Sequence, residues 1–334
     1  MKNFNVAVVG ATGFVGRQMI KILEEREFPV KKIFLFASEN SAGELIKFKD
    51  IPCEVQTLNK NSFQNIDFAL FSAGTAVSKE YAPLAVKNES IVIDNSNAFR
   101  MDPNVPLIVP EVNPEDLDKH QGIIANPNCS TIQLVVALKP IKDEVDIKRI
   151  IVSTYQSVSG TGKKAEDELS EQSQQVLAHK KISRDVYPHQ IGFNIIPHID
   201  DFESNGYTKE EMKMVHETKK IFKDNNLNIT ATAARVPVFI GHSESVYIET
   251  KKFVTIHKIR DIYLKTQGIK LVDDIMHNKY PMAIMSETYD DVMIGRIRKD
   301  LAEPNGINMW IVANNLRKGA ALNAVQIAEI LKNR

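Results

Sequence analysis

The feature that most constrains the fold is a glycine-rich turn near the start of the chain. Gly10, Gly13 and Gly16 follow the apolar run 6–9 and lead into segment 14–25, whose apolar residues recur at helical spacing. Gly10 allows a tight turn, Gly13 lets the backbone approach a pyrophosphate, and Gly16 permits close packing of helix on strand. The free N–H groups at the start of such a helix favour phosphate. The turn therefore predicts a dinucleotide-binding βαβ unit.

The spacing of these glycines is G-x-x-G-x-x-G, which differs from the usual G-x-G-x-x-G fingerprint. Taken alone, the turn could also be a simple connection between a strand and a helix. Its position directly after the first predicted strand favours the cofactor site.

Further apolar runs at 32–37, 67–71 and 91–94 indicate buried strands of a parallel sheet that is covered on both faces. From about residue 148 the runs become longer and partly alternate, which is typical of a mixed or antiparallel sheet. We therefore expect an α/β protein with an N-terminal Rossmann-type domain and an α+β domain with a mixed sheet. In the second part of the chain we expect strands at 149–155, 230–236, 245–250 and 282–286, and helices at 163–180, 209–222, 259–267 and 315–332.

Composition and charge narrow the class of protein. Lys plus Arg and Asp plus Glu each number 42, and a net charge of zero argues against nucleic acid as a partner. No apolar run approaches the roughly 20 residues needed to span a bilayer, and no signal-peptide layout is present. Two cysteines, Cys53 and Cys129, make no disulfide framework, so we expect a cytoplasmic protein. No Cys/His cluster indicates a metal site.

Cys129 is the most reactive candidate residue. It lies in the turn-like segment 126–131, directly before the apolar helical run 132–138. The dipole at a helix N-terminus favours the thiolate over the thiol, whose ordinary pKa is about 8.5. A thiolate is the nucleophile that acyl transfer needs. Most lone cysteines are small buried hydrophobes, which we expect of Cys53, whereas the polar setting of Cys129 favours a functional role.

The segment after the second predicted strand should meet the adenosine ribose of the cofactor. Glu39 would suit the free 2′-hydroxyl of NAD, whereas Ser38 and Ser41 would suit the 2′-phosphate of NADP. No arginine lies in this loop. The residues alone therefore leave the choice of cofactor open.

Six blocks, in order along nearly the whole chain, resemble aspartate-β-semialdehyde dehydrogenase. The first is the glycine turn, which many families share. The segment around Cys129 and the spacing of Arg235 and His242, seven positions apart, are much more specific. The other blocks are 156–162, 210–213 and 314–321. The order of these motifs identifies the chain as similar to that family, whose fold is like that of glyceraldehyde-3-phosphate dehydrogenase.

The resemblance implies catalytic roles for three residues. Cys129 would attack the acyl carbon, Gln156 would orient the acyl group, and His242 would act as the general acid/base. The implied reaction is the reductive dephosphorylation of L-aspartyl-4-phosphate to L-aspartate-4-semialdehyde with NADPH, through a cysteine thioester. It belongs to the biosynthesis of lysine, threonine, methionine and diaminopimelate.

The resemblance also implies the groups that bind substrate and cofactor. The α-carboxylate would pair with a guanidinium fork, the ammonium group with a carboxylate, and the phosphate with two cations. These substrate-binding residues are Arg235, Glu210, Arg100 and Lys213, with Asn128 lining the same pocket. The cofactor-binding residues are Gly10, Ala11, Thr12, Gly13, Phe14, Val15, Gly16, Ser38, Ser41, Ser72, Gly74, Ser159, Gly160 and Asn315.

Each assignment has a simpler alternative. Arg100 could be a solvated loop residue, and Glu210 with Lys213 could only stabilise a helix as an i, i+3 pair. The segment 235–242 could be core strand, and His198, a second acid/base candidate, is expected to be structural.

The resemblance implies NADP as the cofactor, but Asn40 stands where a basic residue is expected, so NAD is also possible. It implies a homodimer or a dimer of dimers. The expected domains are an NADP-binding domain at 1–130 with 315–334, and a substrate-binding and dimerisation domain at 131–314.

Four other functions are alternatives to this one. N-acetyl-γ-glutamyl-phosphate reductase and glyceraldehyde-3-phosphate dehydrogenase place other residues around their cysteine than Asn128 and Ser130. An inactive dinucleotide-binding paralogue would lack one of Cys129, Arg235 or His242, and all three are present. A cofactor-free thiol hydrolase would not need the glycine turn.

Overall fold

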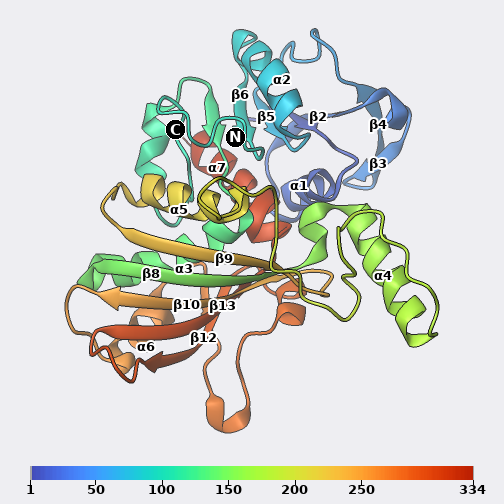
Figure 1. The fold of residues 1–334 in the computed structure, drawn as a ribbon. Helices are drawn as coiled ribbons and strands as arrows, with labels where there is room; N and C mark the ends of the chain where they lie inside the picture. The colour runs from blue at the N-terminus through green and yellow to red at the C-terminus, as the bar shows by residue number, and fades with distance from the viewer. Residues whose placement is uncertain (1, 334) are drawn as a thin grey trace. The chain divides into compact units, whose positions relative to one another are not determined.

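The computed structural model describes residues 2–333, which form two compact units (Figure 1). Unit 1 consists of Met1–Asn128 and Ala320–Arg334, and unit 2 of Cys129–Gly319. The expected division into two binding domains at 130 and 315 stays a prediction. No helix in the described part of the chain is long and apolar enough to cross a membrane.

Unit 1 is built on a seven-stranded sheet with the order β3-β4-β2-β1-β5-β6-β7. All neighbouring strands are parallel except β3, which pairs antiparallel with β4. The parallel sheet expected from the apolar runs is thus confirmed. The strands are β1 (Phe4–Val9), β2 (Val30–Ala37), β3 (Leu45–Phe48), β4 (Ile51–Thr57), β5 (Phe68–Phe71), β6 (Ile91–Asp94) and β7 (Ile123–Ala125). The helices are α1 (Phe14–Glu25), α2 (Thr75–Lys87) and α7 (Leu322–Lys332), with the short 3-10 helices η1 (Glu39–Ser41) and η2 (Pro114–Lys119).

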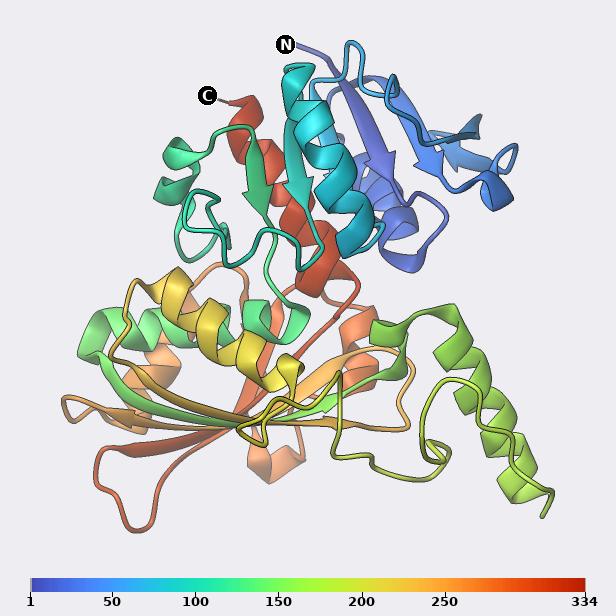
Figure 2. The ribbon, with the colours of Figure 1, turned by 45° about the horizontal axis from the view of Figure 1, so that its top comes forward.

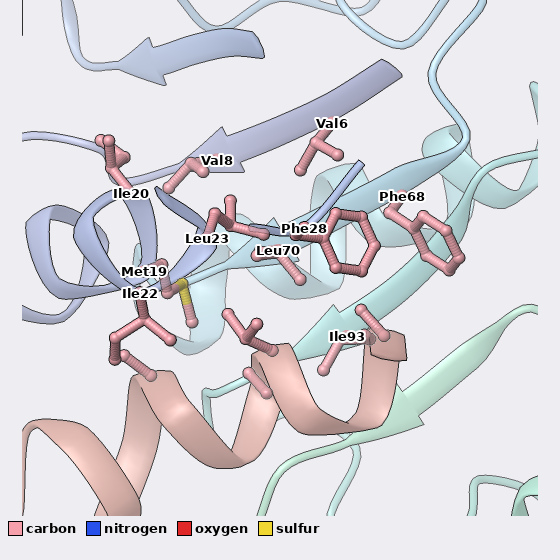
Figure 3. Packing of buried hydrophobic residues seen from close by; sticks show 14 of the residues in the cluster. Val6, Val8, Met19, Ile20, Ile22, Leu23, Phe28, Phe68, Leu70 and Ile93 are labelled. Carbon is pink, nitrogen blue, oxygen red and sulfur yellow. The ribbon is translucent and has the colours of Figure 1, made fainter. Parts of the chain in front are cut away.

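The sheet of unit 1 buries apolar side chains on both faces, because successive residues of a strand point to opposite sides. Val6 and Val8 of β1 pack with α1 and α7 in one cluster, which Figure 3 shows from close by. Ala7 and Val9 pack on the other side in a second cluster, with residues of α2. Continuous burial of β1 explains its uninterrupted apolar run.

Unit 2 contains a six-stranded mixed sheet with the order β11-β12-β13-β10-β8-β9, as expected for the second part of the chain. Helices α3, α5 and α6 pack on one face of it (Figure 2). The strands are β8 (Ile147–Gln156), β9 (Asn228–Arg235), β10 (His242–Thr250), β11 (Ile269–Leu271), β12 (Val292–Lys299) and β13 (Gly306–Ala313). The helices are α3 (Cys129–Val145), α4 (Lys163–Leu177), α5 (Lys209–Phe222) and α6 (Ile256–Lys265), with the 3-10 helices η3 (Val158–Thr161), η4 (Ile275–His277) and η5 (Ala283–Glu287).

Some expected elements differ from the structure. The strand expected at 282–286 is wrong, because these residues form the 3-10 helix η5 and leave the apolar side chain of Ile284 72% exposed. The final helix begins at Leu322 after a π-helical turn, η6 (Arg317–Ala321), and not at 315. Helix α4 ends at 177 and α6 spans 256–265, a few residues from the expected bounds. Elements that were not expected are α2, β3, β4, β7, β11, β12 and β13.

Candidate active site

The topology of unit 2 gathers several motif residues at one edge of its sheet. Helix α3 leads directly into β8, which runs back along it, so Cys129 at the helix start lies at the same end as Gln156 at the strand end. Helix α5 and the parallel neighbour β9 repeat this arrangement and place Glu210 and Arg235 at the same end. The antiparallel strand β10 begins there with His242. Residues that are far apart in the sequence therefore meet at one edge.

Cys129 is the first residue of α3, which confirms the expected position of the thiol at a helix N-terminus. The π-helical turn packs closely against it. A Cβ atom on Gly319 would lie only 2.9 Å from the Cβ of Cys129 and 3.3 Å from its Cα. Glycine at 319 is therefore required for this turn to approach the thiol. Cys53, expected to be buried, is half-buried on β4 and packs against the core of unit 1.

The His242 ring is fully buried and held in one tautomer. Its Nδ1 accepts a hydrogen bond from the backbone N–H of Ser157 at 3.1 Å, so the proton of the neutral ring lies on Nε2. Burial, and then the charge of Arg235, lower the pKa of His242 well below its ordinary value of 6.5. Among residues 2–333 the Nε2 atom has no hydrogen-bond partner. His242 thus presents a neutral N–H donor at the sheet edge.

Gln156, Glu210 and Lys213 form a polar chain in which the first two side chains are buried and Lys213 is partly exposed. The Nε2 of Gln156 donates to Oε1 of Glu210 at 3.0 Å, and Nζ of Lys213 donates to Oε2 of Glu210 at 3.1 Å and to Asp200 at 2.7 Å. Burial opposes the charge of Lys213, but the carboxylates of Glu210 and Asp200 outweigh it and raise the pKa of the amine. The expected i, i+3 pair of Glu210 and Lys213 therefore exists, and Glu210 also bonds to Gln156 at the end of β8.

The guanidinium of Arg235 is buried beside His242. Its Nη1 donates to the carbonyl of Ser157 at 2.6 Å, while Nε has no partner among the described residues. A Cβ atom on Gly160 would lie 3.2 Å from Nη1 of Arg235 and 3.5 Å from Nε2 of His242. The backbone of Gly160 thus lies close to both groups, and a side chain there would crowd them.

Asn315 ties together the segments that surround His242. Its Oδ1 accepts from the backbone N–H of Gly241 at 2.9 Å and from the hydroxyl of Ser157 at 3.1 Å, and its Nδ2 donates to the hydroxyl of Ser159 at 2.9 Å. The motif identified Asn315 and Ser159, but no sequence signal indicated that Ser157 holds the imidazole. His198, expected to be structural, stacks on Phe202 with ring centroids 4.4 Å apart.

In unit 1 the glycine turn has the geometry that a pyrophosphate needs. Gly10 has φ +84°, and a Cβ there would lie 2.4 Å from the carbonyl oxygen of Ser72. A Cβ on Gly16 would lie 2.1 Å from the carbonyl oxygen of Gly10. No side chain caps the start of α1, so its first N–H groups can bind an anion. The residues present therefore fit a dinucleotide.

The other predicted residues of unit 1 lie around this turn or on the neighbouring loops. The hydroxyl of Thr12 donates to that of Ser41 at 3.4 Å. Ser38 precedes the helix η1, and Gly74 precedes α2. Two predicted substrate-binding residues, Arg100 and Asn128, are buried, and the Nε of Arg100 donates to the carbonyl of Asn126 at 2.9 Å.

The structure adds one residue beside the predicted ribose loop. Arg17, in the second turn of α1, donates from Nε to the carbonyl of Thr12 at 3.1 Å and forms an ion pair with Glu44. It therefore lies beside the Thr12–Ser41 contact. No sequence signal indicated it, because Ser41 lies on a different loop.

A dinucleotide-binding unit, joined to a unit with a helix-start cysteine, a neutral imidazole donor and a buried guanidinium, defines a cysteine-dependent, nicotinamide-linked aldehyde dehydrogenase. Comparisons with known proteins identify the family. Residues 5–120 match the family model described as semialdehyde dehydrogenase, NAD binding domain, and residues 138–318 match that described as semialdehyde dehydrogenase, dimerisation domain. The chain belongs to the aspartate-semialdehyde dehydrogenase family, as its relatives show.

The aspartate-semialdehyde dehydrogenase of Aquifex aeolicus is 55% identical over 332 residues, with 98% of each chain covered. That of Bacillus subtilis is 50% identical, covering 99% of this chain and 98% of its own. A crystal structure of aspartate semialdehyde dehydrogenase II from Vibrio cholerae, complexed with ASA, has a TM-score of 0.97 and 48% identity, covering 100% of this chain and 99% of its own.

These findings confirm the expected fold class, enzyme class and reaction. The chain is an oxidoreductase of amino-acid biosynthesis that converts L-aspartyl-4-phosphate to L-aspartate-4-semialdehyde through a cysteine thioester. The reaction serves lysine, threonine, methionine and diaminopimelate biosynthesis. The expected cofactor, NADP with NAD possible, is also confirmed.

Proposed function

We propose that Cys129 is the nucleophile of this reaction. The observation that supports it is the position of the thiol at the first residue of α3, at the sheet edge where Gln156, Arg235 and His242 also lie. The thiolate attacks the acyl carbon of L-aspartyl-4-phosphate and forms a C–S bond. The C–O bond to the phosphate then breaks, and phosphate leaves with the electron pair. Backbone N–H groups at the helix start stabilise the oxygen that becomes negatively charged.

His242 stabilises the same oxygen by donating a hydrogen bond from Nε2. A neutral imidazole whose Nδ1 already accepts the Ser157 N–H is a donor at Nε2 and not a base for the thiol. NADPH, when bound, supplies the hydride that reduces the thioester. The C–S bond then breaks, which frees the aldehyde and returns the Cys129 thiolate.

The substrate is held by its charged groups. Arg235 is suited to the α-carboxylate, because its buried Nε has an unused N–H and a planar fork matches a carboxylate. Glu210 faces the ammonium group, and its hydrogen bond from Gln156 links this ammonium-binding residue to the residue that orients the acyl group. Lys213 stays charged beside Glu210 and Asp200 and is suited to phosphate. Arg100 and Asn128 stay predictions from the motifs.

Cofactor binding is divided between two sets of residues. The turn of Gly10, Gly13 and Gly16, with Ser38, Ser41, Ser72 and Gly74, belongs to a unit that we propose binds the nucleotide. Ser159, Gly160 and Asn315 belong to the unit that we propose binds substrate, and we propose that they contact the nicotinamide end of the cofactor. Arg17 supplies a positive charge next to Ser41 and favours NADP where Asn40 does not.

A homodimer is the assembly that the dimerisation-domain match supports. Its proposed surface is the face of the unit 2 sheet opposite α3, where Tyr155 packs on Trp310 with ring centroids 5.3 Å apart. A cavity of about 530 Å³ opens on this face, lined by Ser243, Ser245, Tyr280, Pro281, Met282, Ala283, Arg296, Arg298, Met309 and Trp310. A dimer of dimers and a cytoplasmic location stay predictions.

The roles can be tested by running the reaction in reverse. The purified protein is incubated with aspartate semialdehyde, phosphate and NADP⁺, and the absorbance of the reduced nicotinamide is followed. We expect reduction that depends on phosphate in the wild type and none in Cys129→Ala with an unchanged melting temperature. Activity of Cys129→Ala near the wild-type level would reject the mechanism. Reduction only with N-acetylglutamate semialdehyde would reject the substrate.

A further inference from the structure

Glu244 is a fully buried acid that the reaction above does not use. It lies on β10 two positions after His242, so both side chains point to the face of the sheet that α3 covers. Its neighbours across the sheet are Thr154 on β8 and Ile311 on β13. Neither carboxyl oxygen has a hydrogen-bond partner among residues 2–333. A buried acid without a partner is costly, and calls for an explanation.

Gln133 is the polar group that faces Glu244 from the helix. It lies four positions, about one helical turn, after Cys129 on α3. Its Nε2 is also buried without a hydrogen-bond partner among the described residues. Gln133 is close enough to Glu244 to favour the charged form of the acid. A small rotation of the two side chains would let the acid donate to the amide oxygen and accept from the amide nitrogen.

Burial favours the protonated form of the Glu244 carboxyl group. Burial raises its pKa well above the ordinary value of 4.5, and Gln133 opposes this only in part. The titratable groups on the same face include Cys129 at the start of α3 and His242 on β10. Helices α6 and α5 add Tyr263, which donates to the carbonyl of Ala137, and Glu211, which accepts from the backbone N–H of Ala233. Beta strands β8 and β13 oppose Glu244 with uncharged residues, and Arg235 lies on β9, beyond β8. An ionised Glu244 would disfavour the Cys129 thiolate.

We propose that Glu244 is a positioning residue. As a neutral acid it contacts Gln133, and this contact holds helix α3, and with it Cys129, in a fixed position relative to His242 on β10. This inference rests on the roles proposed for Cys129 and His242. A shift of about 1 Å between the nucleophile Cys129 and the donor His242 is enough to slow the reaction about 100-fold. The charged substrate-binding groups Glu210, Lys213 and Arg235 stand on α5 and β9, so the effect should fall on kcat and not on KM.

Three variants separate positioning from a purely structural role. Glu244→Gln keeps the shape and both hydrogen-bonding functions, and its kcat should stay within about threefold of wild type. Glu244→Leu removes the polar contact and should lower kcat about tenfold or more, with KM for aspartate semialdehyde within about twofold. Gln133→Leu removes the same contact from the helix side and should reproduce this loss if Glu244→Leu fails to fold.

The second measurement is the pH dependence of Cys129 alkylation by iodoacetamide, in a Cys53→Ser background so that one thiol reacts. It does not depend on turnover, so it distinguishes a failure of this inference from a failure of the proposed function. A neutral Glu244 predicts the same apparent thiol pKa in wild type and Glu244→Gln. If Glu244 were ionised, the glutamine would lower that pKa by more than about one pH unit.

Each outcome decides the inference. A kcat loss in both leucine variants, with Glu244→Gln active and its alkylation profile unchanged, would support it. Wild-type kcat in a folded Glu244→Leu would overturn it, as would a kcat loss in Glu244→Gln as large as that in Glu244→Leu. A lower thiol pKa in Glu244→Gln would overturn the neutral state of the acid.

Discussion

Gly319 lets the π-helical turn pack directly against Cys129, and the substitution Gly319→Ala tests whether this contact matters for catalysis. The added Cβ would lie 2.9 Å from the Cβ of Cys129 and 3.3 Å from its Cα. Carbon atoms in contact prefer about 3.5–4.0 Å, so one segment must move by about 0.6–1 Å. The atoms that are met lie on or next to the backbone, so rotation of a flexible side chain cannot relieve the contact. The shift must therefore displace Cys129 or the π-helical turn.

The expected losses of stability and of kcat follow from this displacement. Overpacking of this kind costs about 1–3 kcal/mol of stability. A misplaced reacting group of up to 1 Å should lower kcat about 10- to 100-fold. Both quantities are measurable on one preparation, by thermal unfolding and by the phosphate-dependent reduction of NADP⁺ with aspartate semialdehyde.

Gly192→Ala is a matched control in the same unit. Its added Cβ would lie 3.0 Å from the Cβ of Gln172 on α4, a similar contact that involves none of the residues at the sheet edge. We expect it to lose comparable stability and to keep kcat within about twofold. If Gly319→Ala kept wild-type kcat, or if both variants lost kcat equally, the close packing of Gly319 on Cys129 would have no catalytic meaning.

Four further predictions concern charge. Because the pKa of His242 lies well below 6.5, kcat should show no inflection near that pH, and an inflection there would contradict a neutral donor. The unfolded chain, but not the folded one, binds a proton at His242 as pH falls through about 6.5, so stability should fall more steeply between pH 7 and 5 in wild type than in His242→Asn, as thermal unfolding would report. Arg235→Leu should raise KM for aspartate semialdehyde about 10- to 100-fold, and an unchanged KM would remove Arg235 from the carboxylate site. Arg17→Gln should lower kcat/KM for NADP⁺ about tenfold but leave NAD⁺ unaffected, whereas equal losses with both cofactors would mean that Arg17 only supports the fold.

Local signals in the sequence predicted the elements that depend on local chemistry. Helix α5 spans Lys209–Phe222 as expected, because Thr208 and Glu211 form a capping box and apolar residues recur along one face. The start of α3 at Cys129 follows from the same kind of signal, a polar turn before an apolar helical run. These elements can be predicted without knowing which distant residues they contact.

The wrong prediction at 282–286 arose where tertiary structure overrides a short apolar run. Met282 and Ile284 suggested alternation, yet both are exposed, 46% and 72% respectively, at the start of the 3-10 helix η5. The strands β12 and β13 were missed because their burial does not alternate regularly along the chain. β13 pairs with β12, which is close in the sequence, and with β10, which lies far away. Pairing that depends on distant segments leaves no local period to recognise.

The active site was also only partly predictable from the sequence. The motifs identified His242, but they did not identify the backbone atom that determines which ring nitrogen carries the proton. The backbone N–H of Ser157 cannot act as an acceptor, so it requires a lone pair on Nδ1 and places the ring proton on Nε2. A thiol hydrolase needs its histidine to take the proton from the cysteine, and a ring that is already protonated at the free nitrogen cannot do so. Activation of Cys129 must then come from the start of α3, and His242 is left to stabilise the negative charge on the substrate oxygen. This division of roles suits a thioester that waits for hydride, because a neutral donor does not activate water for hydrolysis.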